Sequence, residues 1–260
     1  MDMIRRLFLL SFTCLFLLAS QAGCAAQEYA YTLAIPGPDD LPAGDAAGIA
    51  LCHVLEEGSC ITLSEDGTTY DFPRIELTSR PIYCKTTYVR NQQQGSWVVS
   101  FFPEDIPMLA AAVDIASPSG EVVGATFGFT VTMLSKWEAE KGDYAFWSLE
   151  DKVLFDTLYA NPAQHEFHVL PTDADISLEA ALQIAQDALA AKYNLPLSDP
   201  ASDILLAYNL IQQQDGSRQW QIDFFKKGHA DGTPDLLYWV YVDAATGEVL
   251  VIDENAGGLG

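Results

Sequence analysis

Residues 177–193 read SLEAALQIAQDALAAKY, and their apolar side chains recur at the three-to-four-residue spacing of an amphipathic helix. Ser177 is a suitable N-cap, and Glu179 places negative charge in the first turn, where the helix dipole favours it. Asn194 and Pro196 follow the last apolar position and end the helix. The stretch therefore predicts one helix with a single buried face.

Four strands are expected after this helix. They are, in order, Ile204 to Ile211, Trp220 to Phe224, Leu237 to Val242 and Glu248 to Ile252. Apolar and polar residues alternate in the second of them, which is typical of a half-buried strand. Asp215-Gly216 and Ala244 to Gly247 are turn sequences between strands. Residues 173–260 are thus predicted to form one helix packed on an antiparallel β-sheet meander.

An earlier part of the chain repeats this pattern in the same order. Tyr88, Trp97, Phe101-Phe102 and Gly120 to Val123 align with Tyr208, Trp220, Phe224-Phe225 and Gly247 to Leu250. The offset grows from 120 to 123 to 127, as expected if loops vary in length and strands do not. Upstream, Asp45-Ala46-Ala47 aligns with Glu179-Ala180-Ala181 at an offset of 134. Residues 27–128 are therefore predicted to be a diverged first repeat.

The first repeat differs from the second in two respects. Its helix, expected over Gly44 to Glu57, is weakened by two glycines, each costing about 1 kcal/mol relative to alanine. It also carries an insertion from Cys60 to Tyr83, with an Asp66-Gly67 turn of its own.

Residues 129–172 are predicted to be a helical connector between the repeats. Ser148 to Asp151 resembles a capping box, and a helical apolar stripe follows it at Leu149, Val153, Leu154 and Leu158. Aromatic residues precede this stripe at Trp137, Tyr144, Phe146 and Trp147. We expect them to pack between two domains rather than form a binding surface, because large rings are mostly buried. The fold class is α+β, with two repeats joined by a helical connector.

Residues 1–26 have the pattern of an export signal. Arg5 and Arg6 precede an apolar run, Leu7 to Ala19, that is shorter than the roughly 20 residues needed to span a bilayer. Cleavage after Ala22 or Ala26 would release a soluble protein. Gln21 to Cys24 also resembles a lipobox in its last three positions, and cleavage before Cys24 would expose that cysteine for lipidation. Both outcomes place the protein outside the cytoplasm, either secreted or anchored at the cell surface.

Charge and cysteine content limit the partners and the covalent links. The net charge of -23 repels phosphate backbones and anionic membranes, which argues against nucleic-acid binding and favours cationic partners or simple solubility. Cys52, Cys60 and Cys84 follow the export signal. Three cysteines allow at most one internal disulfide, and their spacing does not select the pair.

The second repeat resembles a PepSY domain. The resemblance is carried by the helix at 177–193, by Trp220 to Phe224, and by YVDAATGEV at 241–249. It covers about residues 173–253 well and 40–127 loosely. The resemblance implies an exported bacterial protein that binds or restrains a peptidase or a peptide, without catalytic residues or cofactors of its own. An alternative is a structural role in cell-envelope assembly.

Three catalytic or metal-binding hypotheses are weaker. His165-Glu166-Phe167-His168 places its histidines three apart, whereas the zinc-protease motif places them four apart on a helix, so a solvated linker is expected here. Ser59-Cys60 has no identifiable acid–base partner. Five central carboxylates are candidates for a glycoside hydrolase but are expected to be a solvated helix face. They are Glu138, Glu140, Asp143, Glu150 and Asp151.

The glycines Gly120, Gly124 and Gly128 are four apart on a predicted strand and its end, and they are interpreted as turn glycines rather than as a phosphate loop. No catalytic, cofactor-binding or metal-binding residue is therefore assigned.

Overall fold

The computed structural model describes residues 31–57, 61–62, 69–70, 81–91, 94–104, 110–127, 130–162, 166–193, 204–226 and 235–254. Within these ranges the chain is α+β, with four α-helices and two five-stranded antiparallel sheets. The predicted export signal with Cys24, the Ser59-Cys60 pair, the predicted Asp66-Gly67 turn, Gly128 and His165 lie outside the described residues.

The first sheet has the strand order β1-β4-β5-β6-β7. Its strands are β1 (Tyr31–Leu33), β4 (Ile82–Asn91), β5 (Gln94–Pro103), β6 (Ala111–Ser117) and β7 (Val122–Phe127). Helix α2 (Ala43–Glu57) packs on one face through Ala46, Ala50 and Val54, all fully buried. In the predicted insertion, β2 (Ile61–Thr62) and β3 (Thr69–Tyr70) form a separate pair.

The second sheet has the order β12-β11-β10-β9-β8. Its strands are β8 (Glu166–His168), β9 (Ile204–Gln213), β10 (Arg218–Lys226), β11 (Asp235–Asp243) and β12 (Val249–Glu254). Helix α6 (Leu178–Tyr193) covers one face through Ala181, Ala185 and Leu189. Ser177 caps this helix as predicted, since its hydroxyl accepts a bond from the Ala180 amide at 3.2 Å.

Each observed sheet has one strand more than the predicted four-stranded meander. β1 and β8 precede the helix of their half and pair antiparallel with the first long strand that follows it. The prediction that Glu166 to His168 is a solvated linker was wrong, because these residues form β8. Each added strand has only three residues, too few for a periodic pattern, and is held by long-range backbone pairing.

The helix alignment also needs a correction of one residue. The buried stripe of α2 begins at Ala46 and that of α6 at Ala181, an offset of 181 − 46 = 135 rather than the predicted 134. The two sequences are similar enough in alanine content to align in either register, and only burial distinguishes them.

A tryptophan ties strand to helix in the same way in both halves. The indole nitrogen of Trp97 donates to the Leu41 carbonyl at 2.7 Å, and that of Trp220 donates to the Ile176 carbonyl at 3.2 Å. Each acceptor lies two residues before its helix begins. Each indole bond therefore fixes where the following helix starts over its sheet.

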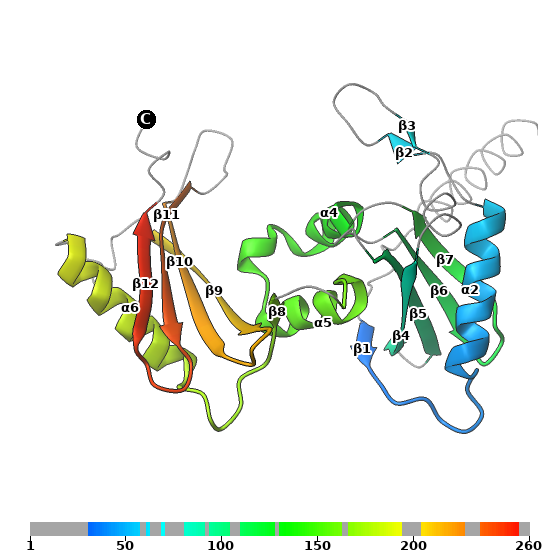
Figure 1. Ribbon diagram of the computed structural model, residues 1–260, viewed down its shortest axis with the longest axis horizontal. Helices are drawn as coiled ribbons and strands as arrows, with labels where there is room; N and C mark the ends of the chain where they lie inside the picture. The colour runs from blue at the N-terminus through cyan, green and yellow to red at the C-terminus, as the bar shows by residue number, and fades with distance from the viewer. Residues whose placement is uncertain are drawn as a thin grey trace, which may run out of the picture.

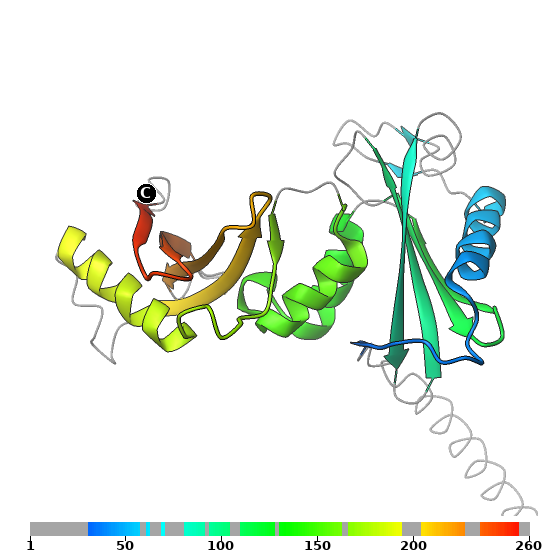
Figure 2. The same cartoon turned by 60° about the horizontal axis from the view of Figure 1, so that its bottom comes forward.

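The connector lies between the two sheets, with α2 and α6 at the outer ends of the molecule (Figures 1 and 2). It comprises α4 (Thr130–Lys141), the 3-10 turn η1 (Tyr144–Phe146) and α5 (Leu149–Tyr159). Ser148 caps α5 as predicted, because its hydroxyl accepts a bond from the Asp151 amide at 3.1 Å. No helix among the described residues is long and apolar enough to cross a membrane.

Helix α5 belongs to both cores. Leu149 lies in the core of the second sheet, whereas Phe155 and Leu158 lie in a cluster with the inner face of the first sheet. Trp137 and Trp147 are each 4% exposed in that cluster, so the prediction that the central rings are packed is confirmed for them. Phe146 is 39% exposed and its ring contacts Phe225.

Replacing Gly247 by alanine should destabilise the protein by about 1–2 kcal/mol, the cost of a left-handed conformation for an L-residue, with an added cost for crowding. Gly247 has φ +75°, and a Cβ there would lie 3.1 Å from the Ile184 side chain. Gly216→Ala is the matched control, since φ is +86° but the surroundings are open. Urea unfolding measures both, and a smaller loss at Gly247 than at Gly216 would contradict the packing argument.

Candidate functional site

The central carboxylates mostly serve as local caps. Asp143 accepts a bond from the Ala145 amide at 2.9 Å, and Asp151 pairs with Lys141 at 2.8 Å. Glu138 accepts from the Tyr144 amide at 3.3 Å. Glu150 is exposed in the first turn of α5. Of the five carboxylates, Glu140 lines the pocket beside β7 that is described below.

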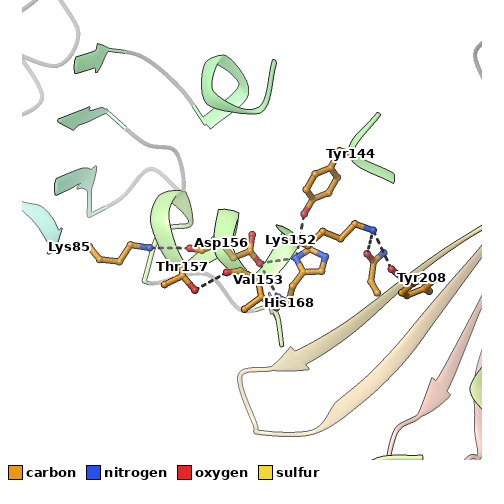
Figure 3. A network of polar contacts seen from close by, with 9 residues as sticks. Lys85, Tyr144, Lys152, Val153, Asp156, Thr157, His168 and Tyr208 are labelled. Atoms are coloured by element: carbon orange, nitrogen blue, oxygen red, sulfur yellow. Dashed lines mark hydrogen bonds and ion pairs between the residues drawn. The ribbon is translucent and has the colours of Figure 1, made fainter. Parts of the chain in front are cut away.

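His168 fastens β8 to α5. Its Nδ1 lies 2.8 Å from Asp156 Oδ2, and the same oxygen accepts a bond from the His168 amide at 2.9 Å. The Tyr144 hydroxyl lies 3.4 Å from the same ring nitrogen (Figure 3). In the part of the chain that the structure describes, no group of three or more His, Cys, Asp or Glu side chains is placed to hold a metal ion.

Lys152 is fully buried between α5 and β9. Its ammonium donates to the Ala145 and Tyr208 carbonyls at 2.9 and 3.2 Å and to Asn209 Oδ1 at 2.7 Å (Figure 3). Burial lowers the pKa of Lys152 to about 8, while the nearby Asp223 opposes that shift. The cation is thus retained by acceptors from two separate parts of the chain.

Lys85 makes the corresponding link to the first sheet. Its ammonium donates to the carbonyls of Asp156 and Ala160 at 3.1 and 2.7 Å, at the C-terminal end of α5. A cation there satisfies end carbonyls and complements the helix dipole. Burial lowers the pKa of Lys85 to about 8 as well, against the attraction of Asp156. Sequence reasoning missed both lysines, because lysine is seldom buried.

Among the residues that the structure describes, two long strands lie at the ends of their sheets, β7 in the first and β12 in the second. On β12, Leu250 is 47% and Val251 is 44% exposed. Lys192 of α6 donates to the Ile252 carbonyl on this strand at 2.8 Å. On β7, Val123 is 57% exposed. Edge strands present backbone groups to which an extended segment can pair.

A pocket of about 100 Å³ opens beside β7 on the inner face of the first sheet. Its lining includes Asp114, Gly124, Lys136 and Trp137. The Tyr31 hydroxyl donates to Asp114 Oδ2 at 2.9 Å. Burial raises the pKa of Asp114 to about 6, against the lowering effects of that hydrogen bond and of Lys136.

The sequence left open which cysteines, if any, form a disulfide. Cys52 and Cys84 are both exposed and both free thiols, so they are not joined to each other. Gly120 has φ +73°, in agreement with its interpretation as a turn glycine, whereas Gly124 lies within β7.

Residues 175–251 match the family model described as Peptidase propeptide and YPEB domain. A PepSY domain is therefore present in the C-terminal half. The PepSY domain contains α6, β9, β10, β11 and the first part of β12, and it leaves β8 outside its matched range. No curated protein and no solved structure matches the chain. The predicted tandem arrangement stays a prediction, because the match covers only the second half.

Replacing Lys152 by methionine should destabilise the protein by about 3 kcal/mol, because it removes the buried cation and leaves its acceptors and Asp223 without it. Lys141→Met is the control, since the Lys141–Asp151 pair is about one-third exposed and should contribute less than about 1 kcal/mol. Chemical denaturation at neutral pH measures both variants. Equal losses would show that the Lys152 contacts do not hold the connector to β9.

Proposed function

We propose that this chain is an exported, non-enzymatic protein that binds a peptidase or a peptide outside the cytoplasm. The observation that carries the proposal is the PepSY domain at residues 175–251, whose family description names a peptidase propeptide. PepSY domains are typically non-catalytic regulatory modules, and proteins that contain them are commonly exported. The export signal at residues 1–26 supports the same location.

We further propose that residues 27–128 are a diverged first copy of the domain, that 129–172 connect the copies, and that 173–260 form the PepSY-like second copy. Three correspondences support this arrangement. The strand orders of the two sheets are equivalent. The indole bonds of Trp97 and Trp220 reach equivalent carbonyls. The glycines Gly120 and Gly247 have φ values of +73° and +75°, each with an isoleucine of its own helix 3.1 Å from where a Cβ would be.

Strand β12 is the proposed binding edge of the PepSY domain. An extended peptide can add to a sheet edge through main-chain hydrogen bonds, while side chains of the edge give selectivity. Leu250 and Val251 offer apolar contact there. The Ile252 carbonyl on this strand accepts a bond from the exposed ammonium of Lys192, which a partner's main-chain amide would replace. The charge of -23 favours a cationic partner.

The proposal covers both a lipid-anchored and a released form of the protein. Cys24 is the proposed lipidation site if the protein is anchored rather than released. Fractionation of cells expressing the wild type and Cys24→Ser distinguishes the two, because only loss of a lipid would move the protein from the membrane fraction to the medium.

Leu250→Lys should abolish capture of a peptidase or peptide from culture supernatant, because the substitution places a charge on the proposed apolar edge. Leu170→Lys is the matched control, since Leu170 is 45% exposed but lies outside both free edges. Affinity capture with mass spectrometry, followed by peptidase assays with and without the protein, provides the measurement.

If wild type enriches no peptidase or peptide beyond an acidic control protein, the peptidase proposal fails. A structural role in envelope assembly then becomes the better account. The hydrolase hypothesis gains no support from the central carboxylates, since Asp143 and Asp151 are engaged in local caps and pairs.

A further inference from the structure

Strand β7 has a hollow on each face of the first sheet. The inner one is the pocket of about 100 Å³ that contains Asp114. The outer one is a shallow groove of about 600 Å³ along α2, lined by Gly48, Cys52, His53 and other residues of that helix and by Val122 of β7. An extended chain directs successive side chains to opposite faces of a sheet. A strand added to β7 would therefore place alternate side chains in the two hollows.

The register of β7 makes the inner pocket accessible from the edge. Asp114 on β6 pairs with Gly124 on β7, and a bulge follows before Ile115 pairs with Val122. Gly124 has no side chain to cover the carboxylate, and a Cβ there would lie 3.4 Å from Asp114 Oδ2. Asp114 is consequently separated from the free edge of the sheet by a residue without a side chain.

The pocket has the chemistry of a cation site. Two carboxylates, Asp114 and Glu140, are balanced by one ammonium, that of Lys136. Lys136 donates to the Thr126 hydroxyl at 2.7 Å in an exposed position, and both residues line the pocket. Trp137 forms part of the wall, and aromatic faces attract cations. The small volume suits the end of one side chain rather than a larger ligand.

We propose that an extended segment of a partner protein pairs with β7 and places a lysine or arginine side chain over Gly124 against Asp114. The inference rests on the proposed peptide binding and specifies the partner's chemistry and a second binding edge. The main chain of the segment supplies pairing along β7, and the basic residue supplies selectivity through a charge-assisted hydrogen bond.

The electrostatics of Asp114 support this site independently of its shape. Because the folded pKa of about 6 exceeds the ordinary value of 3.8, the contribution of Asp114 to stability is present below pH 3.8 and lost as the pH rises through 6. At neutral pH the ionised carboxylate is thus retained at a cost to folding. A bound cation would offset that cost, and Tyr31, Lys136, Glu140 and Tyr159 are the other titratable groups that line the pocket.

A short capped peptide of alternating valine and threonine with one central lysine is the direct probe, and the same peptide with norleucine is its control. The protein is used as purified after export, and binding is measured by calorimetry. At about pH 8 the lysine peptide should bind about tenfold more tightly than the norleucine peptide, as expected for one charge-assisted hydrogen bond.

Two variants assign the effect to the pocket. Asp114→Asn should remove the preference for lysine, whereas Asp151→Asn, which changes an exposed carboxylate elsewhere, should keep it. Gly124→Val should weaken both peptides by obstructing the pocket, and circular dichroism checks that it folds. Lowering the pH to about 5 should remove the wild-type preference by protonating Asp114. The norleucine control accounts for any effect of His53 in the outer groove.

Equal binding of the two peptides to wild type, or an undiminished lysine preference in Asp114→Asn, would overturn the inference. Its failure can be distinguished from failure of the proposed function. Lysine-selective binding without peptidase capture would retain the β7 site and reject the peptidase proposal. Peptidase capture without lysine selectivity would retain the peptidase proposal and reject the β7 site.

Discussion

The two-sided burial of α5 is the constraint on which the arrangement of the molecule depends. One end of the helix contributes Leu149 to the second core, and the other contributes Phe155 and Leu158 to the first. Lys152 reinforces this position, because a buried cation needs acceptors and finds them on η1 and β9. Lys85 does the same at the far end of the helix. The connector is therefore an integral layer between the sheets.

This layer determines which surfaces remain available for binding. The rings of α4 and α5 cover most of the inner face of the first sheet, which leaves the small pocket beside β7. The outer faces are covered by α2 and α6 (Figure 1). Among the described residues, the long edge strands β7 and β12 are not covered by these helices, and they are the edges at which we propose that a partner adds. The proposed peptide binding at the sheet edges is compatible with these covered faces.

Local signals in the sequence predicted much of the fold. The α6 stripe, the Ser148 cap and the Asp215-Gly216 turn all depend on neighbouring residues, and the structure confirms them. β1 and β8 were missed because long-range pairing forms them. The candidate binding site was missed for a related reason. Gly124 was interpreted as a turn residue, and its importance depends on the register that places it opposite Asp114.

The central claim is that the connector joins both halves into one folding unit, and differential scanning calorimetry of the purified protein tests it most directly. The account predicts a single transition whose calorimetric and van't Hoff enthalpies agree. Two separate transitions, with one half melting while the other stays folded, would contradict it, because α5 could not then be an essential part of both cores.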